Sequence, residues 1–313
     1  MNLLTIVIVN WNAGPKLADC IVSIALYHSG LVSSVVIIDN ASSDDSLAQV
    51  GGFKRLPFQL HIVRNNDNHG FGAACNQGAA LGTSEYLLFL NPDAMVFSGS
   101  VDKVLAFMQD PANEKVGICG VQLVGEDGEI ARSCARFLSV IGFLSHAIGL
   151  DRVLPRLGHC MAEWSHDVTR EVDHVIGAFF LVRRTLFETL GGFDERFFVY
   201  YEDVDFSYRA RCAGWRSVYL ADVQAYHAGG GTSHQVKAKR LFYSLRSRLL
   251  YVFKHFKKID ACAVLLVTLF VEPLSRLVLA VMRLSWCSFK ETCQGYWLLF
   301  RWLPEWIIEG YTR

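Results

Sequence analysis

The chain has 313 residues, with 30 Lys plus Arg and 30 Asp plus Glu, so its formal net charge is zero. Its 52% hydrophobic residues, 19% charged residues and seven prolines exclude a disordered chain and a collagen-like repeat. The length allows one large α/β domain with an appendage, or two domains.

Apolar runs alternate with helical segments through the first 235 residues. Buried strands are predicted at 4–9, 35–38, 60–63 and 86–90, with helices over 15–27 and 70–81. This alternation predicts a doubly wound α/β fold, with a mostly parallel sheet and helices on both faces. Ligands of such sheets bind beyond the carboxyl ends of the strands. Those ends carry polar side chains here: Asn10, Asp39, Asn40, Asn91 and Asp93.

The tail of the chain is basic, with 13 Lys plus Arg against five Asp plus Glu in 237–313. Between 237 and 258, basic and apolar residues alternate at spacings of three and four, which predicts a basic amphipathic helix. The apolar stretch 261–271 is expected to be too short to span a bilayer, which needs about 20 residues. Tryptophans follow. We therefore expect a helical tail, 236–313, on an anionic membrane surface. Packing on the catalytic domain or on a second subunit is the alternative.

The cysteines and the first residues both bear on the compartment. Nine scattered cysteines without a CxxC pair indicate neither a zinc site nor a disulfide framework. The opening MNLLTIVIVNWN lacks a basic region and is predicted to form a buried strand rather than a signal peptide. We expect a cytoplasmic protein with reduced thiols.

Two strand ends carry carboxylates suited to a nucleotide. Asp39 could accept a hydrogen bond from a pyrimidine N3–H, although the Ser and Asp residues after it are also good helix caps. In Asn91-Pro92-Asp93, the carboxylate of Asp93 could hold Mg²⁺ or Mn²⁺ against a diphosphate. A turn aspartate that caps the next helix is the alternative for Asp93.

Three carboxylates, Glu202, Asp203 and Asp205, lie within four residues at a predicted helix start. Capping the helix needs only one or two acids, so it does not account for all three carboxylates. Like charges this close raise one another's pKa, which suits a general base near neutral pH. His227 ends a later strand before a glycine run, where it could ligate a metal, contact a phosphate or be structural. Lys237, Lys239 and Arg240 beyond it could neutralise a leaving diphosphate.

Taken in order, these segments resemble glycosyltransferase family 2 over about residues 3–235. The resemblance is carried by IVIVNWN, VIIDNASSD, NHGFGAACNQG, LFLNPDA and, above all, GGFDERFFVYYEDVDFSYRARCAGW. Within the family, the chain is most similar to bacterial rhamnosyltransferases of O-antigen and cell-wall polysaccharide assembly. The resemblance implies a GT-A domain over 1–235, a dTDP-rhamnose donor and a polyprenyl-diphosphate-linked acceptor. It also implies a peripheral location at the cytoplasmic face of the inner membrane.

The resemblance implies roles for individual residues as well. Asp39 would meet the pyrimidine base, and other side chains would line the nucleotide site: Asn10, Asn12, Asn40, Asn76 and Asn91. Asp93 would hold Mg²⁺ or Mn²⁺, with help from His227, and Asn91 stands where the family usually has an aspartate. Asp203, with Glu202 beside it, matches the catalytic base of an inverting transfer.

Two alternatives to this function stay open. A UDP-hexose donor is one, because Asp39 would contact any pyrimidine alike. A catalytically inactive nucleotide-binding scaffold in an assembly complex is the other, because Asn91 brings no charge to the metal. No nucleic-acid partner is expected, and the sequence leaves the oligomeric state open. Residues 130–172 are expected to form an insertion that shapes the acceptor site.

Overall fold

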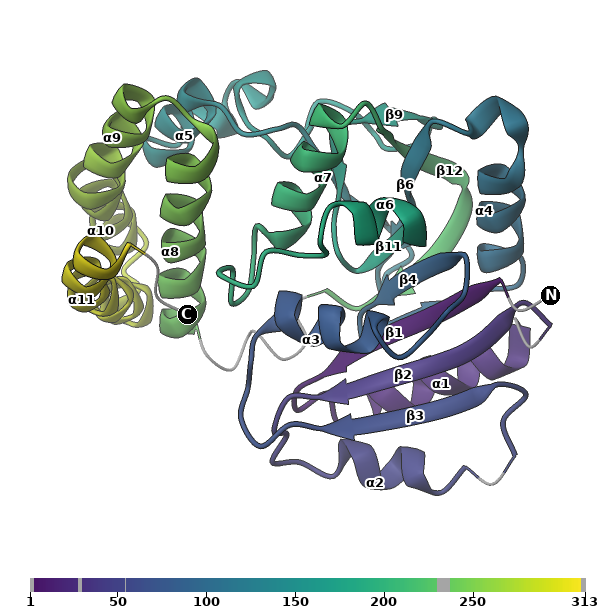
Figure 1. Ribbon diagram of the computed structural model, residues 1–313. Coiled ribbons are helices and arrows are strands. Elements are labelled where there is room, and N and C mark those ends of the chain that lie inside the picture. Colours follow the sequence, from purple (N-terminus) through teal and green to yellow (C-terminus); the bar gives the residue numbers. More distant parts are fainter. Residues whose placement is uncertain (1–2, 28–29, 54, 230–236, 311–313) are drawn as a thin grey trace. The chain divides into compact units, whose positions relative to one another are not determined.

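The alternating apolar runs of the first part of the chain fold into one α/β unit (Figure 1). The computed structural model describes residues 3–27, 30–53, 55–229 and 237–310. The chain divides into two compact units, of which the first comprises 1–136, 164–194 and 202–232. The second comprises 137–163, 195–201 and 233–313.

The first unit is built on a sheet with the strand order β3-β2-β1-β4-β11-β6-β12-β5, to which β7 and β9 are added at β6 and β12. Its strands are β1 (Leu4–Asn10), β2 (Val32–Asp39), β3 (Gln59–Arg64), β4 (Tyr86–Leu90), β5 (Ala94–Val96), β6 (Val116–Val124), β7 (Ile130–Ala131), β9 (Arg170–Val172), β11 (Phe179–Arg183) and β12 (Arg216–His227). A two-stranded ribbon pairs β8 (Cys134–Ala135) with β10 (His174–Val175).

The helices of this unit are α1 (Lys16–Tyr27), α2 (Ser46–Gly51), α3 (Phe71–Ala79), α4 (Ser100–Gln109), α6 (Arg184–Thr189) and α7 (Glu202–Cys212), with a 3₁₀ turn at Pro111–Asn113. Strands β1 to β4 are parallel, and β6 is parallel to β12, whereas β11 runs antiparallel between β4 and β6. The prediction of a mostly parallel sheet with helices is confirmed. The antiparallel β11 was not predicted.

Successive residues of β1 face opposite layers, as the two-residue period of a strand requires. Ile6 and Ile8 belong to the main apolar core together with Leu17 of α1. Val7 instead meets α3, where a Cβ added to Gly78 would lie 2.4 Å from Val7 Cγ1. The small residues of α3 therefore let this helix approach the sheet closely.

Alanine at position 78 is expected to destabilise the protein by about 1–3 kcal/mol, because its methyl group would force Val7 or the helix to move. Urea unfolding would measure the change. Gly51→Ala is the control, since a Cβ there meets nothing within 4 Å. If both variants are equally stable, the close packing of α3 on β1 is not a source of stability.

An aromatic cluster joins α7 to β4. Phe89 of β4 lies 5.0 Å from Phe193 and 5.1 Å from Phe187 between ring centroids, and Phe206 of α7 lies 5.3 Å from Phe193. The cluster holds the helix that begins with Glu202-Asp203 against the strand that ends before Asn91. Two segments that are far apart in the sequence are thereby fixed within one framework.

The second unit is helical. It contains α5 (Val140–Ala147), two 3₁₀ turns (Leu150–Arg152 and Pro155–Leu157), α8 (Lys237–His255), α9 (Lys258–Leu266), a π-helical turn (Val267–Val271), α10 (Glu272–Met282) and α11 (Trp286–Glu309). The predicted tail is joined here by 137–163, which lies inside the stretch predicted as an acceptor-site insertion. Phe143 of α5 packs on Phe256 with ring centroids 6.2 Å apart. This insertion therefore contributes to the helical unit.

The basic amphipathic helix predicted over 237–258 is observed as α8, and its middle is enclosed within the second unit. Residues 245–252 of α8 are all buried, including Arg246 and Arg248. Arg248 forms an ion pair with the buried Glu272 of α10, and Arg246 lies over the ring of Trp302 at 5.6 Å. These partners are distant in sequence, so the pattern of α8 alone could not reveal that its charges are enclosed.

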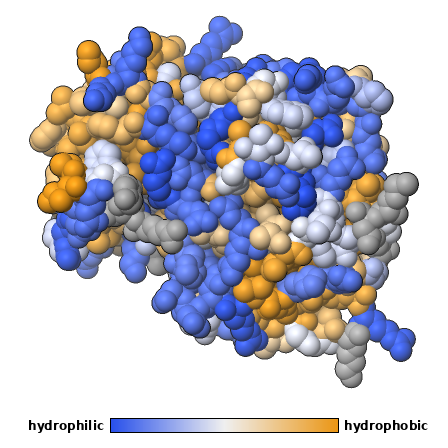
Figure 2. Space-filling view, viewed as in Figure 1, coloured by the Kyte–Doolittle hydropathy of each residue, from blue (hydrophilic) through white to orange (hydrophobic). Residues whose placement is uncertain are grey.

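The prediction that the following stretch is too short to span a bilayer is wrong on length. Helix α9, the π-helical turn and α10 are continuous over Lys258–Met282, which gives 25 residues with the length and apolar composition of a membrane span. Only 22% of its most apolar window is buried. Figure 2 shows apolar side chains at the surface of this unit. Phe270, Leu274 and Val278 are among its exposed apolar residues. The C-terminal helices are thus compatible with membrane association.

Candidate active site

The ends of β1 and β2 hold a buried polar pair. Asn10 and Asp39 lie opposite each other in the parallel register, and Asn10 Nδ2 donates to Asp39 Oδ1 at 2.7 Å. The backbone N–H of Ser42 donates to the other oxygen, Oδ2, at 3.3 Å. Asp39 is only 4% exposed, so its carboxylate is held in one orientation. Each oxygen retains a lone pair for a further donor, such as a pyrimidine N3–H.

Asn12 organises the loop beside this pair. It adopts a left-handed backbone (φ 52°), and its Oδ1 accepts from the N–H of Ser43 at 2.7 Å and of Asp44 at 3.3 Å. Asp44 in turn accepts from the N–H of Gly14 at 2.8 Å and from Ser46. Burial alone would raise the pKa of Asp44, but these hydrogen bonds lower it below its usual value. The turns after β1 and β2 thus form one hydrogen-bonded unit.

Asn40 and Asn76 are engaged by the protein itself. Asn40 Nδ2 donates to the carbonyl of Gly70 at 3.1 Å, just before α3. Asn76 Nδ2 donates to the carbonyl of Phe193 at 2.8 Å, and its Oδ1 accepts from the N–H of the same residue at 2.9 Å. Both amides thus hold the structure together at these positions, and the nucleotide contact predicted for them from the sequence stays a prediction.

Asn91, Asp93 and His227 come together where the turn after β4 meets the end of β12. Because β5 pairs with the end of β12, His227 lies opposite Ala94. His227 Nε2 is 3.3 Å from Asp93 Oδ1 and 3.2 Å from Asn91 Nδ2. The pairing of two distant segments thus creates the group that the resemblance implied. Residues 230–236, with the end of the glycine run, lie outside the described residues.

A lysine missed in the sequence stands close to this group. Burial alone would raise the pKa of Asp93, but the hydrogen bond and charge of His227 and the charge of Lys16 lower it below its usual value. Lys16 is the first residue of α1 and the only Lys or Arg in residues 1–50. Its isolation directly after the first strand is the signal that could have identified it.

The three carboxylates at the start of α7 have three different environments. Asp205 is fully buried and pairs with Arg209 Nε at 2.8 Å. Glu202 is buried, and its Oε2 has no hydrogen-bond partner within the described part of the chain. Burial and, secondarily, the charge of Asp203 raise the pKa of Glu202 well above its usual value. The mutual effect of neighbouring carboxylates therefore acts on Glu202, where burial favours the neutral form of the side chain.

Asp203 is partly exposed and fixed by the backbone. The N–H of Gly177 donates to Oδ2 at 2.8 Å, and the N–H of Val204 donates to Oδ1 at the same distance. The next residue, Ala178, contacts the turn after β4, because its carbonyl accepts a hydrogen bond from the N–H of Asn91 at 3.0 Å. One dipeptide before β11 therefore ties Asp203 to the turn that carries Asp93. Sequence reasoning missed Gly177, since the partner of its N–H is 26 residues away.

A divalent ion needs several oxygen or nitrogen donors at one place. No group of three or more His, Cys, Asp and Glu side chains gathers anywhere in the residues that the structure describes. Asp93 and His227 supply one carboxylate and one imidazole, and the amide oxygen of Asn91 could be the third donor, because Asn91 lies beside them. Mg²⁺ and Mn²⁺ are commonly bound by one or two carboxylates plus substrate phosphates. The residues fit an ion held jointly with a diphosphate.

Residues 5–191 of the chain match the protein family described as "Glycosyl transferase family 2". Among curated proteins, the chain is 30% identical over 267 residues to N-acetylglucosaminyl-diphospho-decaprenol L-rhamnosyltransferase of Mycobacterium tuberculosis, covering 80% of this chain and 84% of that protein. It is 26% identical over 172 residues to rhamnosyltransferase WbbL of Escherichia coli, covering 54% of this chain and 61% of that protein.

Solved structures share the fold. The mannosyltransferase PcManGT from Pyrobaculum calidifontis, solved with GDP-Man and Mn²⁺, aligns with a TM-score of 0.56 at 17% identity, covering 95% of this chain and 84% of that one. TarS residues 1–349 from S. aureus align with a TM-score of 0.54 at 14% identity, covering 98% and 92%. The predicted GT-A type of sheet is confirmed by these similarities together with the family match.

Proposed function

The chain belongs to glycosyl transferase family 2, and from this premise we propose that it transfers L-rhamnose from a dTDP-linked donor to a polyprenyl-diphosphate-linked saccharide, with inversion at the sugar. One observation carries the proposal. A partly exposed, backbone-held Asp203 is joined through Gly177-Ala178 to the turn of Asp93, whose side chain contacts His227. The M. tuberculosis relative, whose name specifies a rhamnosyl transfer to a diphospho-decaprenol acceptor, supports the sugar and the acceptor class.

An inverting transfer needs a base on the acceptor hydroxyl and positive charge at the departing diphosphate. Asp203 accepts the proton of that hydroxyl, because its two backbone donors hold the carboxylate in a fixed orientation. Asp93 and His227 would hold Mg²⁺ or Mn²⁺, which supplies positive charge to the diphosphate when bound. Lys16 adds a fixed positive charge at the same place. Asp39 accepts the N3–H of thymine or uracil.

Calorimetric titration of dTDP, UDP and GDP, with and without Mn²⁺, tests the donor site. We expect dTDP to bind more tightly than GDP, and we expect Mn²⁺ to strengthen its binding. Asp93→Ala should remove the Mn²⁺ effect and weaken binding by roughly tenfold or more, because it deletes a ligand carboxylate. Tighter binding of UDP than dTDP would favour a UDP-hexose donor. No binding of any diphosphate would contradict the proposal and favour a scaffold role.

We propose that the second unit places the enzyme on the cytoplasmic face of the inner membrane as a peripheral protein. The mid-helix residue Glu272 is 2% exposed at its side chain and is paired with Arg248 and Arg276, and Ser275 donates to the carbonyl of Ala147. These contacts support a helix packed within the unit, with its apolar face outward, rather than one crossing a bilayer alone.

The double substitution Phe270→Glu and Leu274→Glu is expected to weaken binding to vesicles of anionic lipid at least about tenfold, because these side chains are 60% and 65% exposed. Vesicle co-sedimentation of the full chain measures it, with carbonate extraction as the test of peripheral attachment. Leu26→Glu, 67% exposed in the first unit, is the matched control. Equal sedimentation of all three proteins would contradict this membrane surface.

A further inference from the structure

The turn between α10 and α11 carries a leucine at a position whose backbone favours glycine. Leu284 has a left-handed backbone (φ 49°). Its N–H donates to the carbonyl of Val281 at 2.9 Å, and the N–H of Ser285 donates to the carbonyl of Ala280 at 2.9 Å. These two hydrogen bonds form a Schellman motif, in which the left-handed residue is usually glycine because a Cβ is unfavourable there.

The same motif ends two helices of the first unit, and both use glycine. After α7, the N–H of Gly214 donates to the carbonyl of Arg211 at 3.0 Å, and the N–H of Trp215 donates to that of Ala210 at 3.0 Å. After α6, Gly191 takes the same place with φ 72°. The leucine after α10 therefore carries a backbone cost that the chain avoids at these other helix ends.

Packing within the protein does not explain this leucine. Leu284 is 93% exposed, and Met282 and Trp286 on either side of it are 76% and 75% exposed. The ring of Trp286 is stacked on that of Phe289, with centroids 5.2 Å apart and 4° between the planes. The turn is tight, because Ser285 also caps the start of α11. Met282, Leu284 and Trp286, here called the apolar corner, are thus exposed together at one ordered turn.

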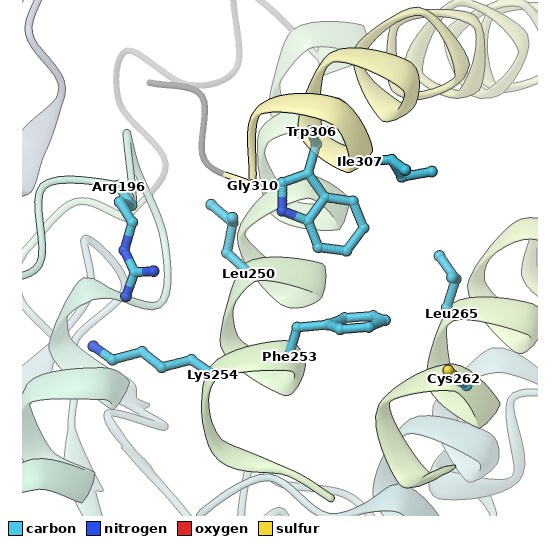
Figure 3. Close-up of a pocket in the computed structure, with 9 residues that line it drawn as sticks. All are labelled: Arg196, Leu250, Phe253, Lys254, Cys262, Leu265, Trp306, Ile307 and Gly310. Atoms are coloured by element: carbon cyan, nitrogen blue, oxygen red, sulfur yellow. The ribbon is translucent and has the colours of Figure 1, made fainter. Parts of the chain in front are cut away.

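The two helices that flank the apolar corner are both fixed on α8. Glu272 of α10 pairs with Arg248 of α8. Trp306 of α11 packs edge-on against Phe253 of α8, with ring centroids 4.9 Å apart (Figure 3). The corner is therefore held by a packed frame.

The charged residues around the apolar corner are all basic. No acidic residue occurs between Glu272 and Glu291. The cations of the same stretch are Arg276, Arg283 and Lys290. Arg276 pairs with Glu272, whereas Arg283 and Lys290 are exposed. Exposed apolar side chains beside cations and an aromatic ring suit the boundary between lipid headgroups and acyl chains, and the cations complement the phosphates of anionic lipids.

We propose that the apolar corner enters the acyl-chain boundary of an anionic lipid membrane and anchors the protein there. The inference rests on the proposed attachment of the second unit to the membrane, and it names the residues that penetrate. Lipid gives the exposed side chain of Leu284 the apolar surroundings that it lacks in the protein. The cost of its left-handed backbone is then offset in the membrane-bound state.

Leu284→Gly tests the proposal, because glycine suits the left-handed backbone and removes only the side chain. In co-sedimentation of the full chain with vesicles of phosphatidylglycerol and phosphatidylethanolamine, it should bind roughly tenfold or more weakly than the parent. Leu284→Met, which keeps an apolar side chain, should stay within about twofold. Leu81→Gly, which removes an exposed leucine of the first unit, is the matched control and should bind like the parent.

Two further measurements separate penetration from a role in folding. The midpoint of urea unfolding of Leu284→Gly without lipid should equal or exceed that of the parent, and a clear fall would overturn the proposal by showing that the leucine serves the fold. Brominated lipids quench nearby tryptophans. Trp286→Phe should lose more of this quenching than Trp302→Phe, whose ring is buried in the parent, and equal losses would contradict penetration by the corner.

The same vesicle assay keeps this inference apart from the proposed membrane attachment. Equal binding of the parent and Leu284→Gly would overturn only the role of the apolar corner. A parent chain that does not bind these vesicles would also contradict the membrane attachment of the second unit. Sedimentation velocity without lipid covers a second copy as the occupant. If the parent self-associates and Leu284→Gly does not, the corner is a contact between copies and the proposal is overturned.

Discussion

Asparagine in place of Asp203 is expected to lower kcat by about 10²–10⁴ while the fold and dTDP binding stay unchanged. The amide cannot take a proton from the acceptor hydroxyl, but its one oxygen can still accept one of the two hydrogen bonds, from Gly177 or from Val204, that hold the side chain. Single-turnover transfer and calorimetric dTDP binding, measured on the same preparation, separate the chemical step from donor binding.

Glu202→Gln is the matched control for this substitution. Because burial favours the neutral form of Glu202, glutamine is its closest substitute, and we expect activity near that of the parent. A raised pKa in the folded state means that the folded chain binds more protons than the unfolded chain. The stability of the parent relative to Glu202→Gln should therefore fall as pH rises above about 4.3, the usual glutamate pKa. An inactive Glu202→Gln beside an active Asp203→Asn would reverse the two roles.

Alanine in place of Glu272 is expected to destabilise the helical unit by about 3–5 kcal/mol, because it leaves the buried Arg248 without its carboxylate. The side chains of this pair are 2% and 6% exposed, so water cannot replace the lost partner. Denaturant unfolding followed by tryptophan fluorescence reports on this unit, which holds Trp286, Trp297, Trp302 and Trp306.

Glu291→Ala is the control in the same unit. Glu291 lies 3.9 Å from Lys237 in a pair whose side chains are 33% and 57% exposed, so its loss should cost less than about 1 kcal/mol. Equal effects of the two substitutions would show that the Arg248–Glu272 pair has no special place in the stability of the helices.

Strands β1, β2 and β4 were predictable because each contains a continuous apolar run that is followed by a polar residue. The run at 4–9 became Leu4–Asn10, and that at 86–90 was placed without error as Tyr86–Leu90. The antiparallel direction of β11 was not predictable, because a continuous apolar run does not indicate which way a strand runs in the sheet. Only its pairing with β4 and β6 sets the direction.

The position of the candidate site at the strand ends was predictable from the sequence. The different environments of its side chains were not. Glu202, Asp203 and Asp205 look alike in sequence, and they differ only in burial and in the partners Gly177 and Arg209. The hydrogen bonds between Asn76 and the backbone of Phe193 were likewise not predicted from the sequence. These distinctions depend on contacts between residues far apart in the chain, which local pattern cannot show.

The tail shows the same limit in a different form. The periodicity of α8 correctly indicated a helix with an apolar face. Its burial depends on α10 and α11, which supply Glu272 and Trp302 to its arginines. The basic amphipathic pattern therefore predicted the helix but could not show that its middle is buried, and exposed apolar side chains lie on later helices.

Transfer of a sugar to a soluble polyprenyl-type acceptor tests the central claim most directly. The full chain would be incubated with Mn²⁺, farnesyl-diphospho-N-acetylglucosamine and one donor. The donors dTDP-rhamnose, UDP-glucose and UDP-galactose are used in separate reactions, and the product masses are measured by mass spectrometry. We predict addition of one deoxyhexose from dTDP-rhamnose, with inverted anomeric configuration by NMR, and none with Asp203→Asn. A chain that binds dTDP but transfers no sugar from any of these donors would contradict the account.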